Sequence, residues 1–101
     1  MTAWGVRYTQ QFTEQLWVLP DTTYERVEDS VDVLASNPGL ARRYDPHYEA
    51  ARPRVPCRNY SVPRTTKVIY LLADEEGREL TMLFLGDARE DPNRRFDRME
   101  W

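Results

Sequence analysis

The sequence contains little that would cross-link the chain, bind zinc or anchor it in a membrane. Its single cysteine, Cys57, cannot form an internal disulfide, and its single histidine, His47, leaves no set of zinc ligands. No apolar run approaches the roughly 20 residues needed to cross a bilayer. The first residues also lack the long apolar stretch of a signal peptide. We therefore expect a soluble cytoplasmic protein that does not bind membranes and uses neither a metal nor a cofactor.

Basic residues are concentrated in one short stretch of an otherwise acidic chain. The 101 residues, enough for one domain, carry a net charge of −3. Residues 52–67 hold five cations and no acid. These are Arg52, Arg54, Arg58, Arg64 and Lys67. Such a block favours phosphate or an acidic partner, whereas the acidity of the whole chain repels a polyanion at long range. Charge alone leaves a binding site and an ordinary solvated strand face equally open.

The centre of the chain predicts a β-hairpin. The apolar runs 68–73 and 80–85 are of strand length and are separated by polar residues, which leaves a loop of roughly four. Gly77 in that loop is available for a positive φ. Both runs are apolar at odd and even positions. Strands of this kind are covered on both faces, or lie centrally and are covered on one face by helices, so the rest of the chain must supply the cover.

Two further segments complete the predicted sheet. Residues 54–62 predict a strand that is at an edge or bulged, because Pro56 removes one ladder donor. With strands 67–73 and 79–85 it forms an antiparallel meander. Residues 6–8 alternate apolar and polar and predict a short edge strand.

Two helices are predicted near the start. Thr9 is a candidate N-cap for a helix that Pro20 ends, and Thr22 with Glu25 fits a capping box for a second helix, which breakers end after Ser36. The apolar stripes are Phe12, Leu16 and Leu19 in the first helix and Tyr24, Val27, Val31 and Leu34 in the second. The short connection predicts an antiparallel helix pair that covers the sheet.

The remaining segments are less regular. Residues 40–53 lack periodicity and predict a long loop, and Phe96 with Met99 predicts a short helix over 92–100. Trp17 lies off the first stripe and is expected in the core rather than at an exposed contact. The fold class is therefore α+β: an N-terminal antiparallel helix hairpin on a twisted sheet of three or four antiparallel strands, with a short C-terminal helix, all in one domain of 1–101.

Three blocks, in this order and spacing, resemble the RelE/ParE toxin superfamily. Leu34 followed by Asn37–Pro38 resembles its "L…NP" helix ending. Residues 67–70, K-V-I-Y, resemble its "Y-R-V-I-Y" strand, and residues 83–89, L-F-L-G-D-A-R, resemble its "V-L-x-V-G-H/D-R" strand end. The resemblance implies the toxin of a toxin–antitoxin pair, neutralised by a small antitoxin. RelE-like members cut mRNA in the ribosomal A site without a metal, whereas ParE-like members act on DNA gyrase.

The resemblance also implies site residues. Lys67 matches the strand arginine that contacts phosphate, Arg58 falls where a basic residue stands, and Arg89 is the best match to the transition-state arginine. Cations of this kind stabilise the transition state of phosphate cleavage. Tyr60 stands where a second basic residue is usual, and Phe96 is the nearest aromatic to the missing catalytic tyrosine. The predicted catalytic residues are thus Arg58, Lys67 and Arg89, with Arg54, Tyr60, Arg64, Arg94 and Arg95 as substrate-binding residues.

Each of these residues has a plain structural alternative. Arg58 and Lys67 fit solvated strand-face charges equally well, and Arg89 fits an ion pair with Asp87, Glu90 or Asp91. Tyr60 is expected to pack or to contact the antitoxin. Cys57 is expected in the core rather than as a nucleophile, and His47 is more often a bystander than a general base.

Two hypotheses follow: a ribosome-dependent, RelE-type endoribonuclease, or a ParE-type inhibitor that binds a protein target such as gyrase. A third is a degenerate member that only binds antitoxin. The nuclease hypothesis expects Arg58, Lys67 and Arg89 to converge on one concave surface.

Overall fold

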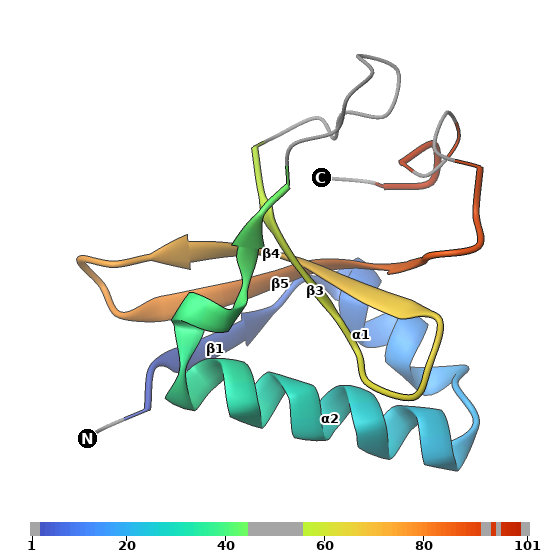
Figure 1. The fold of residues 1–101 in the computed structure, drawn as a ribbon, viewed down its shortest axis with the longest axis horizontal. Helices are drawn as coiled ribbons and strands as arrows, with labels where there is room; N and C mark the ends of the chain where they lie inside the picture. Colours follow the sequence, from blue (N-terminus) through green and yellow to red (C-terminus); the bar gives the residue numbers. More distant parts are fainter. Residues whose placement is uncertain (1–2, 45–55, 92–93, 95, 100–101) are drawn as a thin grey trace.

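The computed structural model describes residues 3–44, 56–91, 94 and 96–99. The chain begins with strand β1 (Gly5–Tyr8), helices α1 (Gln10–Trp17) and α2 (Asp21–Ser36), and the 3-10 turn η1 (Pro38–Leu40). It continues with strands β2 (Arg42–Arg43), β3 (Arg58–Ser61), β4 (Lys67–Asp74) and β5 (Glu79–Asp87). Both α-helices lie on one side of the sheet (Figure 1). No helix in the described part of the chain is long and apolar enough to span a bilayer.

The five strands form one mixed sheet in the order β1-β5-β4-β3-β2. The predicted meander of β3, β4 and β5 is confirmed, and so is the edge strand near residues 6–8. The expectation of an antiparallel sheet of three or four strands is wrong in two details. β1 pairs with β5 in parallel, and Arg42–Arg43 adds a two-residue strand within the segment predicted as a loop. Neither pairing leaves a local signal, because both depend on residues distant in the sequence.

Helix α1 begins as predicted. The Thr9 side chain accepts a hydrogen bond from the Phe12 N–H, and Phe12 and Leu16 are buried in the core. Trp17 was expected in the core, but its side chain is 75% exposed. Successive residues of a helix point about 100° apart, so the residue after Leu16 faces away from the sheet.

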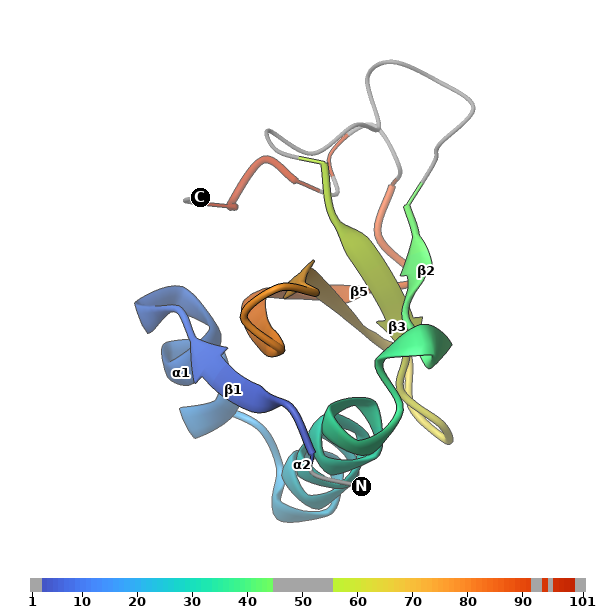
Figure 2. The ribbon, with the colours of Figure 1, turned by 90° about the vertical axis from the view of Figure 1, so that its left-hand side faces the viewer.

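Helix α2 begins two residues earlier than the predicted capping box, which would make Thr22 the N-cap. Asp21 is already helical and Pro20 is the N-cap, so Thr22 lies inside the first turn and the box is absent. The predicted stripe is otherwise buried at Val27, Val31 and Leu34, whereas Tyr24 is exposed. α2 runs along the length of the sheet (Figure 1), and Figure 2 looks along the axis of this helix.

The β4–β5 hairpin has the predicted four-residue connection, 75–78. The positive φ, however, belongs to Arg78 (51°) and not to Gly77. Gly77 serves a different purpose there. Its N–H donates to Asp74 Oδ1, and a Cβ at Gly77 would lie 2.5 Å from Asp74 Oδ2. Gly77 therefore permits a close approach rather than a special backbone angle.

Each face of the central strands has its own apolar core, so the structure selects cover on both faces from the two arrangements that their uninterrupted apolar runs allow. On the helix side, Ile69, Leu71 and Met82 pack with Phe12, Leu16, Val27, Val31 and Leu34. The other side is built from Cys57, Val68, Tyr70, Leu83, Phe84, Phe96 and Met99. Successive residues of β4 alternate between the two cores, as strand geometry requires.

The segment after β5 covers the second core, but not as the predicted helix. Phe96 and Met99 are buried as expected. In the described positions, the backbone forms turns in which Arg94, Asp97 and Met99 each donate to a carbonyl three residues earlier. The rest of the predicted 92–100 helix lies outside the described residues, as do His47, Arg54 and most of the predicted loop.

Candidate anion-binding site

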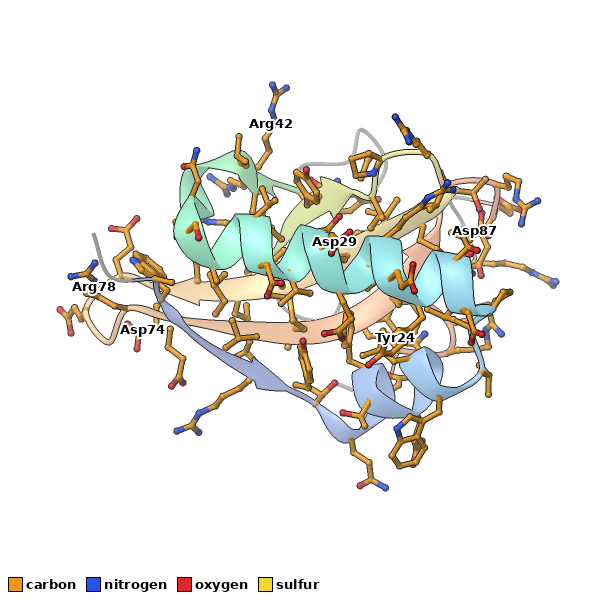
Figure 3. All side chains as sticks on the ribbon, turned by 90° about the horizontal axis from the view of Figure 1, so that it is seen from below. Tyr24, Asp29, Arg42, Asp74, Arg78 and Asp87 are labelled. Atoms are coloured by element: carbon orange, nitrogen blue, oxygen red, sulfur yellow. The ribbon has the colours of Figure 1, made fainter. Side chains whose placement is uncertain are left out.

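The candidate site forms where β4 begins and β5 ends. Lys67 and Asp87 are directly opposite in the β4–β5 ladder, and their charged groups are 3.7 Å apart. Arg89 lies two residues beyond Asp87. Figure 3 shows Asp87 at the opposite end of the sheet from Asp74 and Arg78 of the hairpin.

The carboxylate of Asp87 accepts four hydrogen bonds. Its Oδ1 receives the backbone N–H of Arg89 at 2.9 Å and Arg89 Nε at 3.1 Å. Its Oδ2 receives Arg89 Nη2 at 3.0 Å and the Thr66 hydroxyl at 3.0 Å. The guanidinium therefore binds side-on, through two parallel N–H groups, which is the strong geometry for an arginine–carboxylate pair. The sequence left three acids open as partners of Arg89, and the structure selects Asp87.

These contacts fix the charges of the site. The hydrogen bonds from the Arg89 side chain hold the pKa of the Asp87 carboxyl well below its usual range, and the backbone N–H of Arg89 and the Thr66 hydroxyl add to this. Asp87 in turn raises the pKa of Arg89. Both groups are therefore ionised at neutral pH. Together with Lys67, they leave one net positive charge at the strand ends.

A hollow of about 380 Å³ lies beside this cluster. One wall is the α1–α2 corner, and the other is the β3–β4 turn. Its lining residues are Val18, Leu19, Pro20, Thr23, Arg64, Thr65, Thr66, Lys67 and Arg89. Three cations and three hydroxyls therefore border one cavity. These are the groups that bind a phosphate or another small anion.

Local contacts hold the β3–β4 turn in place. Thr65 Oγ1 donates to the Val62 carbonyl and accepts the Lys67 N–H, each at 3.0 Å. Arg64 adopts a positive φ of 63°, and its carbonyl accepts a hydrogen bond from Arg26 Nη1 of α2 at 3.0 Å. The turn is therefore tied to the helix that forms the opposite wall.

Arg58 does not join Lys67 and Arg89. It lies on the same face of the sheet as Lys67 but is paired with Leu71, four residues further along β4. At about 3.3 Å per residue this is roughly 13 Å from Lys67. Its guanidinium is instead 3.5 Å from the Glu75 carboxylate. The expected convergence of three cations therefore holds for Lys67 and Arg89 only.

A second hollow lies beside Arg58. It has a volume of about 280 Å³, and its lining combines Arg43 and Arg58 with Pro56, Cys57, Leu71, Leu72 and Ala73. Arg43 and Arg58 are cross-strand partners, so two like charges share the rim of an apolar floor. Cys57 is 6% exposed, and burial raises the pKa of its thiol to about 11. Cys57 is therefore a neutral core residue, as expected.

The other predicted site residues have different positions. Tyr60 is half-buried and packs against the helix-side core, and its binding roles stay predictions. Arg64 borders the hollow at Lys67 and Arg89. Arg94 is exposed in the final turns, and Arg54 and Arg95 lie outside the described residues.

Sequence reasoning missed two contributors. Thr66 donates to Asp87, and Arg98 forms an ion pair of 2.7 Å with Glu90 beside a smaller hollow that also includes Lys67 and Asp87. In the sequence, Thr66 stands out only by its position next to a predicted strand. Polar residues are common at such positions, so this did not identify Thr66 as a site residue. Among the described residues, no three His, Cys, Asp or Glu side chains are grouped to hold a metal.

The sequence itself matches no protein-family model and no curated protein. Solved structures do match. The RelE–RelB complex from Pyrococcus horikoshii has a TM-score of 0.66 at 16% identity and covers 90% of this chain and 100% of that chain. The RelBE2 toxin–antitoxin complex from Mycobacterium tuberculosis gives 0.65 at 17% identity, with 89% and 97% covered. The RelBE complex from E. coli gives 0.64 at 14% identity, with 87% and 100% covered. Over nearly its whole length, the chain has the fold of the RelE toxins.

Proposed function

We propose that this protein is the toxin of a toxin–antitoxin pair and cleaves mRNA on the ribosome without a metal. The observation that carries the proposal is that Lys67 and Arg89 both contact Asp87 at the end of the sheet, beside a hollow that Arg64 also borders. The RelE fold supports the toxin role. The cations supply what a phosphate substrate requires.

The reaction class follows from these charges. In the proposed reaction, the 2′-hydroxyl oxygen of a nucleotide forms a bond to the adjacent phosphorus, and the bond from phosphorus to the 5′-oxygen breaks. The proton of the 2′-hydroxyl is lost and the 5′-oxygen gains one, which leaves a 2′,3′-cyclic phosphate and a 5′-hydroxyl. Negative charge builds up on the phosphate oxygens in the pentavalent transition state. Fixed cations next to these oxygens lower its energy.

Lys67 and Arg89 have different parts in this scheme. Lys67 is a compact charge that can approach any phosphate oxygen, whereas the planar guanidinium of Arg89 can bind two oxygens at once. Three threonine hydroxyls border the same hollow, but those of Thr65 and Thr66 already donate to the Val62 carbonyl and to Asp87, so only the hydroxyl of Thr23 is left to donate to the substrate. Arg58, roughly 13 Å along the strand, would bind a more distant part of the RNA.

A cognate antitoxin is the proposed protein partner. Three of the similar structures are complexes of RelE-type toxins with their antitoxins. The cationic strand ends of this chain, together with Arg43 and Arg58, would attract acidic side chains of such a partner.

Growth and RNA cleavage test the nuclease directly. Expression of the wild-type chain should arrest growth and fragment mRNA. Arg89→Ala should reduce cleavage about 100-fold or more, as loss of a transition-state donor does, and restore growth at equal protein level. Arg42→Ala removes an exposed arginine from β2 instead, and this variant should cleave mRNA and arrest growth as the wild type does. Growth arrest with intact mRNA would contradict the proposal.

One observation favours a second candidate. Phe96 is buried and has no hydroxyl, so the nearest aromatic to the family's missing tyrosine cannot move a proton. A ParE-like inhibitor of DNA gyrase does not need such a group. A gyrase supercoiling assay beside the cleavage assay separates the two functions. A chain that co-purifies with the product of an adjacent small gene but is not toxic would be a degenerate member that only binds antitoxin.

A further inference from the structure

Asp87 is unexpected in a site for phosphate. A carboxylate at the centre of a cationic cluster cancels one positive charge and repels the substrate. Its side chain is nevertheless only 12% exposed and accepts four hydrogen bonds, two of them from the Arg89 side chain. The hydrogen bonds between Asp87 and Arg89 explain what this carboxylate contributes to the site.

The bonds to Asp87 use only one edge of the Arg89 guanidinium. A guanidinium has five N–H groups, and here Nε and one N–H of Nη2 point at the carboxylate. Three N–H groups remain, one on Nη2 and two on Nη1. The side chain is 75% exposed, and no other hydrogen bond to it is found in the described part of the chain. The edge formed by Nη1 and Nη2 is therefore open to a bidentate anion.

The backbone makes this arrangement rigid. The Arg89 N–H and the Arg89 Nε both donate to Oδ1 of Asp87, so the side chain is folded back onto its own turn. The Thr66 hydroxyl holds the second carboxylate oxygen from the neighbouring strand. An exposed arginine without these bonds would sample many rotamers and would lose more conformational entropy on binding.

We propose that Asp87 is a positioning residue, which fixes the guanidinium plane of Arg89 so that its Nη1–Nη2 edge faces a phosphate in the hollow. This inference rests on the proposed function for its catalytic consequence. Asp87 does not block the site, because it and the phosphate bind two different, adjacent edges of the same guanidinium, with one N–H of Nη2 directed to each. Asp87 weakens the electrostatic attraction of the site for the substrate, but it fixes the orientation of Arg89 in the transition state.

The substitution Asp87→Asn separates this role from simple charge screening. An asparagine is of nearly equal size, but its NH₂ group opposes one N–H of the arginine fork. Removal of the negative charge should leave KM for programmed ribosomes unchanged or lower. Loss of the fixed guanidinium should lower kcat about tenfold or more. Glu76→Gln, which removes the same charge in the distant hairpin, is the matched control and should change neither constant.

A second measurement needs no catalysis. In the wild-type protein, the Arg89 Nε proton should exchange with water at least tenfold more slowly than that of the exposed Arg42, as measured by NMR at neutral pH. Asp87→Asn should abolish the difference. Equal exchange rates for Arg89 and Arg42 in the wild type would overturn the inference, even if the variant did not fold.

The outcomes separate the two proposals. Failure of the wild type to cleave mRNA would overturn the proposed nuclease, and the exchange rates would still decide whether Asp87 holds Arg89. Cleavage by the wild type with an equal kcat in Asp87→Asn would overturn the positioning role alone. A rise in kcat in that variant would also overturn it, because Asp87 would then only screen the cations.

Discussion

The side-chain amide of Gln15 and the backbone of Leu85 form two hydrogen bonds with each other, both 2.8 Å long. The Gln15 Nε2 donates to the Leu85 carbonyl, and its Oε1 accepts the Leu85 N–H. β1 pairs with β5 only as far as Met82, so the edge of β5 beyond that point has no neighbouring strand. The side chain of Gln15 in α1 takes the place of a neighbouring strand at this point. Without it, the N–H and the carbonyl of Leu85 would be unpaired at the sheet edge.

Replacement of Gln15 by alanine should therefore destabilise the protein by about 2 kcal/mol. The loss reflects one N–H and one carbonyl left unpaired in a partly buried position, and urea denaturation measures it. Gln10→Ala on the same helix removes an exposed amide that contacts only Glu14, and it should change stability by less than about 0.5 kcal/mol. Equal stabilities of the two variants would refute the edge-closing role.

Thr9 should matter more than Thr22, although sequence reasoning gave both a capping role. Thr9 Oγ1 accepts the Phe12 N–H at 3.1 Å and donates to the Leu83 carbonyl at 2.8 Å. Thr9→Ala should cost about 1–2 kcal/mol in a thermal or urea melt. Thr22→Ala, inside the first turn of α2 without a cap bond, should be within about 0.5 kcal/mol of the wild type. A larger loss of stability for Thr22→Ala than for Thr9→Ala would support the capping box predicted at Thr22.

Gly86 should not tolerate a methyl group. A Cβ there would lie 2.7 Å from Cε2 of Tyr70, a fully buried ring. Gly86→Ala should therefore destabilise the chain by about 1–3 kcal/mol through overpacking. Gly39→Ala, whose Cβ would lie 3.6 Å from Asn37 Oδ1, provides the comparison and should be tolerated. Equal melting temperatures for the two variants would contradict this packing argument.

The contribution of Asp87 to stability should depend on pH. Its carboxyl pKa is lowered in the folded state, chiefly by the hydrogen bonds from the Arg89 side chain. A lowered pKa stabilises the fold above the usual aspartate value of about 3.9, and this stabilisation is lost as the pH falls towards the folded pKa. The stability difference between wild type and Asp87→Asn should therefore be constant from about pH 7 to pH 5 and shrink below about pH 4. Urea melts at each pH measure it, and a difference that grew on acidification would contradict the assignment.

Cys57 should react slowly with alkylating agents. Burial raises the pKa of its thiol from 9.0 to about 11, so the thiolate fraction at pH 8 falls about 100-fold. Iodoacetamide should therefore modify the native protein at least about 100-fold more slowly than the urea-unfolded chain. Similar rates in the two states would show that the thiol is accessible, contrary to its place in the second core.

Local patterns predicted the features that neighbouring residues decide. The stripe Val27, Val31 and Leu34 marked the buried face of α2, and the two apolar runs marked a hairpin that needs cover from the rest of the chain. Thr9 was predicted as a cap because a cap bond joins residues three apart. Arg89 was selected by its match to the superfamily motif and its position just past a strand end, and its site role stays a prediction; its partner remained one of three acids.

What the sequence by itself determined is thus the two N-terminal helices, the strand near residues 6–8, the meander of β3, β4 and β5 and the four-residue hairpin, because spacing and chain breakers act over a few residues. Only the tertiary structure decided the parallel pairing of β1, the exposure of Trp17, the choice of Asp87 as the partner of Arg89, and the distance of Arg58 from Lys67. The pairing of β1 and the distance of Arg58 from Lys67 depend on register between segments that are far apart in the sequence, and a shift of one residue would move a side chain to the other face of the sheet. Trp17 is exposed because the packing of α1 on the sheet decides which face of the helix is buried, and Asp87 is the acid that the turn after β5 brings against the Arg89 guanidinium.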